Sequence, residues 1–432
     1  MSPLEIGVIS LLGLLGLLLL GCPIGLAMAL AGFLGFTAIV GLSPALAVIE
    51  TAAFDVASNA GFALIPLFLL MGSLMAQAGL ARDLFAGAAR LTRGWPGGLA
   101  AAGLTASAGF AAVSGSSLAT ASTMTRIAYP EMARRAYDPR LAAGSLAAGG
   151  TLGIMIPPSI ALLLYALITE QSVDEMFLAG VLPGLLAYTL YLIVIMILAQ
   201  RWRPLGPKGG GAEEGLSLGG ALLAFAPCLA LFALIIGGLY GDVFTPTEAG
   251  GVGAGLALLF ALWRGARAPE IFAALGETVR ATAAIFLILI GAEIFGYVLS
   301  TSQLSFAIAE MLTQEALAPW HVLALILAFY VLLGCVVESL GMILLTAPIF
   351  HPIIVANGFD PVWFGVLAVV AVELGLITPP IGLNLFMVKS QAPTLPHRAL
   401  MIGVAPFIAA DILRLALLAF IPAIALWLPG RL

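Results

Sequence analysis

Two copies of a short motif combine glycine, hydroxyl residues and adjacent prolines inside apolar stretches. The first, Gly153–Ser159, reads GIMIPPS, and the second, Gly375–Ile381, reads GLITPPI. Proline removes a backbone donor and clashes with the preceding turn, so each helix must break there. In lipid, the freed carbonyls must find partners or line a polar cavity. Paired breaks at matching places in two halves indicate a transporter's binding site. Ordinary proline kinks are the alternative.

The motif belongs to an internal repeat with a constant separation of 222 residues. No gap is needed to keep this separation over some forty residues. A repeat of this kind predicts two related structural halves. Three other landmarks share the same separation: Ser117 and Ser339, Tyr129-Pro130 and His351-Pro352, and Asp138-Pro139 and Asp360-Pro361.

The composition is that of a membrane protein. Hydrophobic residues make up 62% of the 432 residues, charged residues only 9%, and the mean hydropathy is +1.14. A soluble globular chain carries roughly 25% charged residues. The 50 glycines suit close helix packing in lipid. Three cysteines and three histidines stand far apart and match no disulfide or zinc spacing. We therefore predict an all-α polytopic membrane protein with no cofactor.

The order of segments predicts scaffold spans and transport regions in each half. Arm helices are expected at Ser43–Asn59 and at Pro269–Val279, the latter followed by a span at Ala281–Leu299. The last span is expected at Ala399–Leu428. The predicted divisions are scaffold and arm (1–60), first transport region (61–200), cytoplasmic linker (201–215), second scaffold and arm (216–280), and second transport region with the last span (281–432).

A re-entrant hairpin is predicted ahead of each broken span. The first hairpin (97–132) is rich in small residues and has a polar centre, Ser114 to Ser117; it precedes the broken span 142–168. The second hairpin (319–355) has a polar centre at Glu338 and Ser339 and precedes the broken span 362–388. A small-residue face for helix packing is the alternative for the first.

The basic residues predict the orientation. With the N-terminus outside, 15 of the 17 Lys and Arg residues fall on inner loops and span edges, as the positive-inside rule requires. The same topology opens the first hairpin to the inside and the second to the outside. The repeats are then inverted, which suits alternating access to a site at the membrane midplane.

Five stretches carry a resemblance to a known family. They read MGSLMAQAGLARDLF from Met71, SGSSLATASTM from Ser114, GTLGIMIPPS around Gly153, ESLGMILLTAPIFHPI from Glu338, and LGLITPPIGLNLF from Leu374. Over essentially its whole length the chain resembles the large membrane subunit (DctM-like) of tripartite ATP-independent periplasmic, or TRAP, transporters. The resemblance implies sodium-driven import of an organic acid such as a C4-dicarboxylate or sialic acid by an elevator motion. It implies a periplasmic binding protein and a separate small four-helix membrane subunit as partners, in a bacterial or archaeal inner membrane.

The resemblance also implies that each hairpin tip pairs with a broken span at a sodium site. Sodium is a hard cation that prefers oxygen ligands, which unwound carbonyls and Ser or Thr hydroxyls supply. For the first site we expect Ser114, Ser117, Gly153, Ile156 and Pro158, and for its mirror Gly334, Gly341, Gly375 and Thr378. Helix N-termini between the tips suit a carboxylate. Candidate substrate contacts are Ser116, Ser159, Glu338, Ser339, Pro380 and Asn384.

Four acids fall in apolar runs, where an ionisable group is a functional candidate. Glu338 is expected to shape the second tip or tune its field, and Asp411 with Arg414 to form a structural ion pair. Glu293 and Glu373 are either protonated or face water. Two other classes stay open: a stand-alone proton- or sodium-coupled carboxylate carrier, and a membrane-embedded enzyme. The enzyme is disfavoured because neither a nucleophile–base pair nor a metal-ligand cluster is evident.

Overall fold

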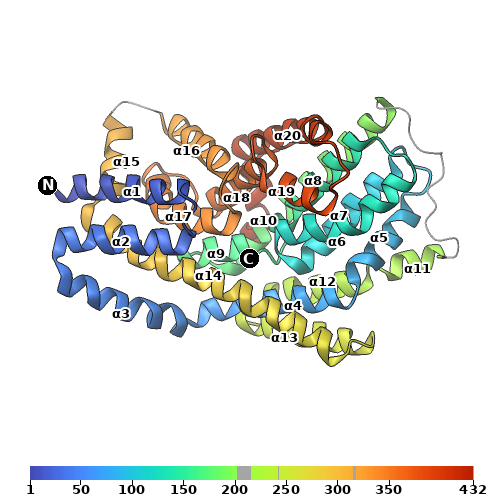
Figure 1. Ribbon diagram of the computed structural model, residues 1–432, viewed down its shortest axis with the longest axis horizontal. Helices are drawn as coiled ribbons and strands as arrows, with labels where there is room; N and C mark the ends of the chain where they lie inside the picture. The colour runs from blue at the N-terminus through green and yellow to red at the C-terminus, as the bar shows by residue number, and fades with distance from the viewer. Residues whose placement is uncertain (202–215, 242, 315–317, 432) are drawn as a thin grey trace.

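The computed structural model describes residues 1–201, 216–241, 243–314 and 318–431, and the regular elements within these ranges are helices (Figure 1). The linker predicted at 201–215 lies, apart from Arg201, outside the described residues. The helices of the first half are α1 (Pro3–Leu19), α2 (Ile24–Val40), α3 (Leu42–Ser58), the 3-10 helix η1 (Ala60–Ala63), α4 (Leu64–Gln77), α5 (Leu80–Leu91), α6 (Gly98–Ser114), α7 (Ser117–Arg134), α8 (Pro139–Met155), α9 (Ile160–Ile168) and α10 (Val173–Arg201).

The second half follows a similar order. Its elements are α11 (Leu218–Leu223), α12 (Ala226–Tyr240), α13 (Pro246–Trp263), α14 (Ala268–Ser302), α15 (Leu304–Gln314), α16 (Pro319–Gly334), α17 (Ser339–Ala356), α18 (Pro361–Ile377), α19 (Leu383–Gln391), α20 (His397–Phe420), α21 (Ala423–Leu426) and η2 (Pro429–Arg431). Among the described residues, seven helical segments are long and apolar enough to cross a membrane, including Pro139–Ile168 with its break. This confirms the prediction of a polytopic membrane protein.

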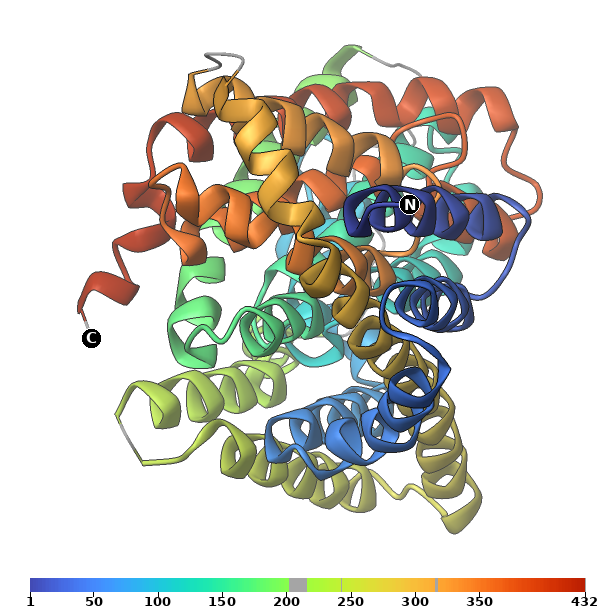
Figure 2. The ribbon, with the colours of Figure 1, turned by 90° about the vertical axis from the view of Figure 1, so that its left-hand side faces the viewer.

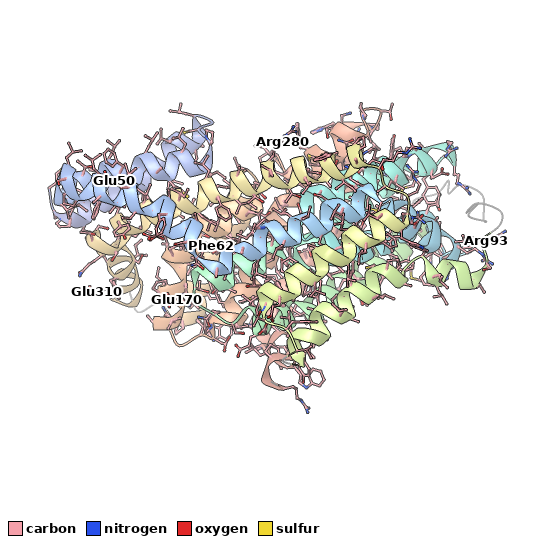
Figure 3. All side chains as sticks on the ribbon, turned by 90° about the horizontal axis from the view of Figure 1, so that it is seen from below. Glu50, Phe62, Arg93, Glu170, Arg280 and Glu310 are labelled. Atoms are coloured by element: carbon pink, nitrogen blue, oxygen red, sulfur yellow. The ribbon has the colours of Figure 1, made fainter. Side chains whose placement is uncertain are left out.

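A peripheral group of helices consists of α1 to α4 with α13 and α14. Helix α14 packs along α2 and α4, and α13 packs on α4. Seen from below, α4, α13 and α14 run side by side, with Phe62 at the start of this layer and Arg280 on α14 (Figure 3). The contact of α2 with α14 is close because glycines face each other: a Cβ on Gly291 would lie 2.2 Å from the carbonyl oxygen of Gly25. Small residues at such a crossing are typical of helix packing in lipid.

A central group contains both helix pairs and both broken helices. Helix α8 packs against α6, α7, α10 and α20, and α18 packs against α16, α17 and α20. Figure 2 shows α20, in red, on the side of the molecule opposite to α13. Every residue from Leu141 to Met155 in α8 and from Val362 to Ile377 in α18 is buried. The two broken helices therefore form the centre of the molecule.

The helices differ from the predicted segments at several places, two of which have a clear local cause. The arm and span expected on either side of Arg280 form one continuous helix, α14, of 35 residues. Neither proline nor a cluster of glycines interrupts Arg280-Ala281-Thr282-Ala283, and alanine favours a helix. The last span, expected to reach Leu428, ends as α20 at Phe420. Pro422 explains this end, because the residue before a proline is disfavoured in helical conformation.

Candidate functional site: two helix turns against two helix breaks

The first helix turn joins α6 to α7 through Gly115 and Ser116. Gly115 adopts a left-handed conformation (φ +59°), which ends α6. The Ser116 hydroxyl then caps α7 by accepting from the backbone N–H of Ala119. Behind the turn, the buried hydroxyls of Ser114 and Thr120 lie 2.8 Å apart, and Thr120 donates to the Ser116 carbonyl at 2.8 Å. The turn thus gathers three oxygen atoms from side chains and backbone.

The first helix break lies directly against this turn. Helix α8 ends at Met155, the next residue, Ile156, is extended, the Pro157–Pro158 peptide is cis, and Ser159 caps α9. A Cβ on Gly153 would lie 2.4 Å from the Ser116 carbonyl oxygen and 2.6 Å from Thr120 Oγ1. A Cβ on Gly115 would lie 2.9 Å from the Pro158 carbonyl oxygen. Only glycines permit this approach of turn and break.

The second turn, between α16 and α17, is built in the same way with a different capping residue. The Glu338 carboxylate accepts from the backbone N–H groups of Leu340 (3.2 Å) and Gly341 (3.3 Å). It also accepts from the Ser339 hydroxyl at 3.1 Å. Glu338 stands 222 residues after Ser116 and has the same role at the start of its helix. The tip-shaping role expected for Glu338 therefore has a structural basis: a negative cap at a positive helix end.

The second break faces the second turn through paired glycines. Helix α18 ends at Ile377, Thr378 follows in extended conformation, the Pro379–Pro380 peptide is cis, and α19 starts after Gly382. A Cβ on Gly375 would lie 2.7 Å from Gly334 Cα and 2.8 Å from the Val331 carbonyl oxygen. The Gly382 N–H donates to the Cys335 carbonyl at 3.1 Å. Gly375 corresponds to Gly153 at the repeat separation, so equivalent glycines form both contacts.

The two halves of the candidate site meet at Ser117 and Asn384, which are 267 residues apart. The Ser117 hydroxyl donates to Asn384 Oδ1 at 2.9 Å, and Asn384 Nδ2 lies 2.7 Å from the Ser117 oxygen. Both side chains are buried. Asn384 Nδ2 lies 3.4 Å from the Ala147 carbonyl as well. One side chain after the second break thus holds the first turn and α8 together.

The structure gathers some predicted site residues and separates others. Ser114, Ser116, Gly153 and Pro158 surround the first contact, and Gly334, Gly375 and Thr378 surround the second. Gly341 instead faces α2, where a Cβ would lie 2.4 Å from Ile24 Cδ1. Ile156 is the C-cap residue of α8. Ser159, Ser339 and Asn384 are buried, whereas Pro380 is exposed. The sodium and substrate assignments of these residues stay predictions.

Sequence reasoning missed Thr120. Its hydroxyl contacts both Ser114 and the Ser116 carbonyl, so it is the central side chain of the first turn. A local signal was present, since Thr120 follows Ser116 by four residues and a helical threonine at that spacing can reach the carbonyl four residues earlier. The predicted site includes only residues of the polar stretch Ser114–Ser117 at this turn, and Thr120 lies outside that stretch.

Both broken helices begin at an aspartate cap. The Asp138 carboxylate accepts from the backbone N–H of Arg140 at 2.8 Å, and Asp360 accepts from the N–H of Trp363 at 2.8 Å. The side chain of Arg140 also donates to Asp138, at 2.6 Å from Nη2 to Oδ2. This hydrogen bond holds the pKa of the Asp138 carboxyl below its usual value. The repeat therefore extends to the start of each broken helix.

The intramembrane acids fall into two environments. Asp411 and Arg414 form the predicted ion pair (Oδ1 to Nη2, 3.0 Å), which is confirmed, and Glu373 joins it through Arg414 Nη2. All three side chains are fully buried. Glu293 is exposed and lines an open pocket with Asp55 and Glu170. Glu170 marks this region in Figure 3. Glu373 therefore has a cation partner, and Glu293 faces the pocket.

Residues 11–424 match the family model described as "Tripartite ATP-independent periplasmic transporter, DctM component". The chain belongs to this family. It is 38% identical over 382 residues to the C4-dicarboxylate TRAP transporter large permease protein DctM of Pseudomonas aeruginosa, covering 88% of each chain. It is 33% identical over 430 residues to the sialic acid TRAP transporter large permease protein SiaM of Vibrio cholerae, covering 97% of each.

A solved structure shares the fold of this TRAP large permease. The YdaH transporter of Alcanivorax borkumensis superposes with a TM-score of 0.62 over 88% of this chain and 89% of that one, at 14% identity. Because the sequence identity is low, this likeness concerns the fold alone.

Proposed function

We propose that this large permease imports an organic acid together with sodium ions across the inner membrane, with its N-terminus on the periplasmic side. A periplasmic binding protein delivers the acid, and a small four-helix membrane subunit completes the complex. The central helix group carries the substrate by an elevator motion against the peripheral group. In this proposal the pairs α6–α7 and α16–α17 are the re-entrant hairpins.

The observation that carries this proposal is the duplicated contact of a helix turn with a helix break. At both places a glycine of the broken helix, Gly153 or Gly375, allows the backbones to touch. Each break frees carbonyl groups, and hydroxyls of Ser114, Thr120 or Thr378 stand beside them. Such groups are suitable ligands for a hard monovalent cation. The duplication supports two cation sites.

The substrate class follows from the relatives and from the helix ends. The two relatives described above are named for C4-dicarboxylates and for sialic acid, which are carboxylates. Helix α7 begins at the first turn with the neutral cap Ser116, so its N-terminus can attract an anion, whereas the N-terminus of α17 already carries the Glu338 carboxylate. Ser116, Glu338 and Pro380 are the members of the candidate substrate set that are not buried. We therefore propose that a substrate carboxylate binds between the two turns.

The test measures the thermal unfolding midpoint of the purified protein against sodium, with choline or potassium keeping the ionic strength constant. A ligand that binds only the folded state stabilises it by RT ln(1 + [L]/Kd), about 2.7 kcal/mol at a hundredfold excess over Kd. Ser117→Ala and Thr378→Ala should each weaken the sodium response. Ser145→Ala is the matched control, because Ser145 is a buried hydroxyl that bonds only within its own helix, to Ala142.

The outcomes separate the parts of the proposal. A sodium-specific rise that both substitutions weaken and the control leaves intact supports the two sites. A rise that survives both substitutions keeps sodium but refutes the assignment of Ser117 and Thr378. A midpoint that ignores sodium and depends strongly on pH instead refutes sodium coupling and favours a proton-coupled carrier.

A further inference from the structure

A chain of buried polar side chains connects the two broken helices. It starts at Thr151 of α8, passes through Tyr191 of α10 and Asp411 of α20, and reaches Arg414, which also pairs with Glu373 of α18. The Tyr191 hydroxyl lies 3.1 Å from Thr151 Oγ1 and donates to Asp411 Oδ2 at 2.6 Å. All five side chains have no exposed area.

The two ends of this chain occupy equivalent places in the repeat. Thr151 stands two residues before Gly153, and Glu373 stands two residues before Gly375. Thr151 and Glu373 are themselves 222 residues apart. The polar chain therefore enters each broken helix at the same position, half a helical turn before the glycine that touches the helix turn.

The charges in this row of buried polar side chains resist separation of the helices that carry them. Two carboxylates share one guanidinium, and α10 contributes Tyr191 as the other titratable group while α8 contributes only a hydroxyl. Among the described residues, no second cation is in contact with these acids. Separating a buried ion pair leaves uncompensated charge in a medium of low dielectric constant. The ion pairs therefore resist any movement of α18 relative to α20.

We propose that Tyr191, Asp411 and Arg414 are positioning residues that couple the two cation sites, so that occupancy of one helix break raises the affinity of the other. This inference rests on the proposed function. Coupling between sites is a free energy that both ligands share, and in two-site systems it raises the Hill coefficient toward the number of sites, about 2. Removing the connection lowers the coefficient without removing either site.

Helix α10 makes two similar threonine–tyrosine contacts, and the second one provides the control for this test. Thr151 bonds to Ala148 in its own helix and contacts the Tyr191 hydroxyl. Thr105 of α6 bonds to Ala101 in its own helix and contacts the hydroxyl of Tyr188, also in α10, at 3.0 Å. The second contact joins the same residue types and the same helix, α10, but within the described residues neither Thr105 nor Tyr188 contacts the ion-paired side chains. Thr105→Val and Tyr188→Phe are therefore the controls for Thr151→Val and Tyr191→Phe.

The experiment measures equilibrium binding of radiolabelled sodium to the purified full chain and takes the Hill coefficient from the binding curve. The wild type and both controls should show a sigmoidal response. Tyr191→Phe should reduce the Hill coefficient to about 1 while keeping the amount of sodium bound at saturation. Thr151→Val, which leaves every ion pair in place, should do the same and serves if Tyr191→Phe fails to fold.

The other possible results would overturn the coupling role, the proposed function or both. Equal steepness in Tyr191→Phe and Tyr188→Phe, or in Thr151→Val and Thr105→Val, overturns the coupling role and leaves the proposed function standing. A wild-type response that is not sigmoidal also overturns the coupling alone. A protein with no sodium response at all overturns the proposed function and the coupling with it.

Discussion

Replacing Gly153 by alanine tests the contact of turn and break directly. The new Cβ would lie 2.4 Å from the Ser116 carbonyl oxygen, about 1 Å inside the ordinary contact distance. Extra atoms in a packed core cost about 1–3 kcal/mol, and the upper part of this range applies because a backbone carbonyl cannot rotate away. Alanine regains about 1 kcal/mol through its helix propensity. The expected net loss is about 2 kcal/mol.

The matched control is Gly255→Ala in α13. Nothing lies within 4 Å of a Cβ at Gly255, so this substitution should gain up to about 1 kcal/mol from helix propensity alone. The two variants should therefore differ by about 3 kcal/mol in the free energy of unfolding. Equilibrium unfolding of the purified protein in mixed micelles, titrated with a denaturing detergent, measures this difference.

The same measurement applies to the second repeat. Gly375→Ala would place a Cβ 2.7 Å from Gly334 Cα, again against backbone atoms. We expect a loss similar to that of Gly153→Ala. If Gly153→Ala and Gly375→Ala are as stable as Gly255→Ala, the turns do not touch the breaks, and the reasoning that assigns the two sites is refuted.

Three further predictions concern side chains around the breaks. Ser117→Ala and Asn384→Ala should each cost about 1–3 kcal/mol of unfolding free energy, because each leaves a buried partner unsatisfied. In a double-mutant cycle, the double variant should lose less than the sum of the two by about 0.5–3 kcal/mol. Strictly additive losses would contradict the hydrogen bond. Arg140 lowers the pKa of Asp138 in the folded state. The pair therefore stabilises the fold fully at pH values above the ordinary carboxyl pKa of about 3.9. This stabilisation is lost as the pH falls through the lower pKa of the folded state. Asp138→Asn, which keeps the helix cap, should remove that part of the acid sensitivity, up to about 1 kcal/mol, in unfolding midpoints recorded against pH; an unchanged pH profile would show that the pair contributes nothing. Glu338→Ala should cost about 1 kcal/mol of unfolding free energy through loss of the α17 cap. Glu338→Gln keeps a hydrogen-bond acceptor and should cost less in the same unfolding assay. Equal losses would show that Glu338 does not stabilise the protein by capping α17.

The sequence predicts the parts of the site that depend on local chemistry. Adjacent prolines break a helix wherever they stand, so Pro157-Pro158 and Pro379-Pro380 locate both breaks without reference to the fold. The repeat then pairs each break with a polar turn one helix earlier. Because such signals are local or periodic, the helix pairs and the broken helices appear close to their predicted bounds.

Contacts between segments far apart in the sequence leave no local pattern from which they could be predicted. Asn384 was expected to bind substrate, and nothing near it in the chain indicates that it holds Ser117. Asp411 and Arg414 were paired correctly because they are three residues apart on one helix, but Glu373 on another helix carries no sign of joining them. The sequence predicts a separate arm and span where the structure has the single helix α14. The change in polarity along this segment marks where the arm meets the span, but it does not interrupt the backbone hydrogen bonds of a helix.

The close contact of α8 with α20 has a consequence for the order in which this protein is made. A Cβ on Gly144 would lie 2.1 Å from the Gly403 carbonyl oxygen, so the two backbones touch. Helix α8 leaves the ribosome early, whereas α20 is one of the last helices to be synthesised. Until α20 is inserted, one side of α8, with its small and hydroxyl-bearing residues, lacks its native neighbour. The first break therefore reaches its final environment only when the second repeat is complete.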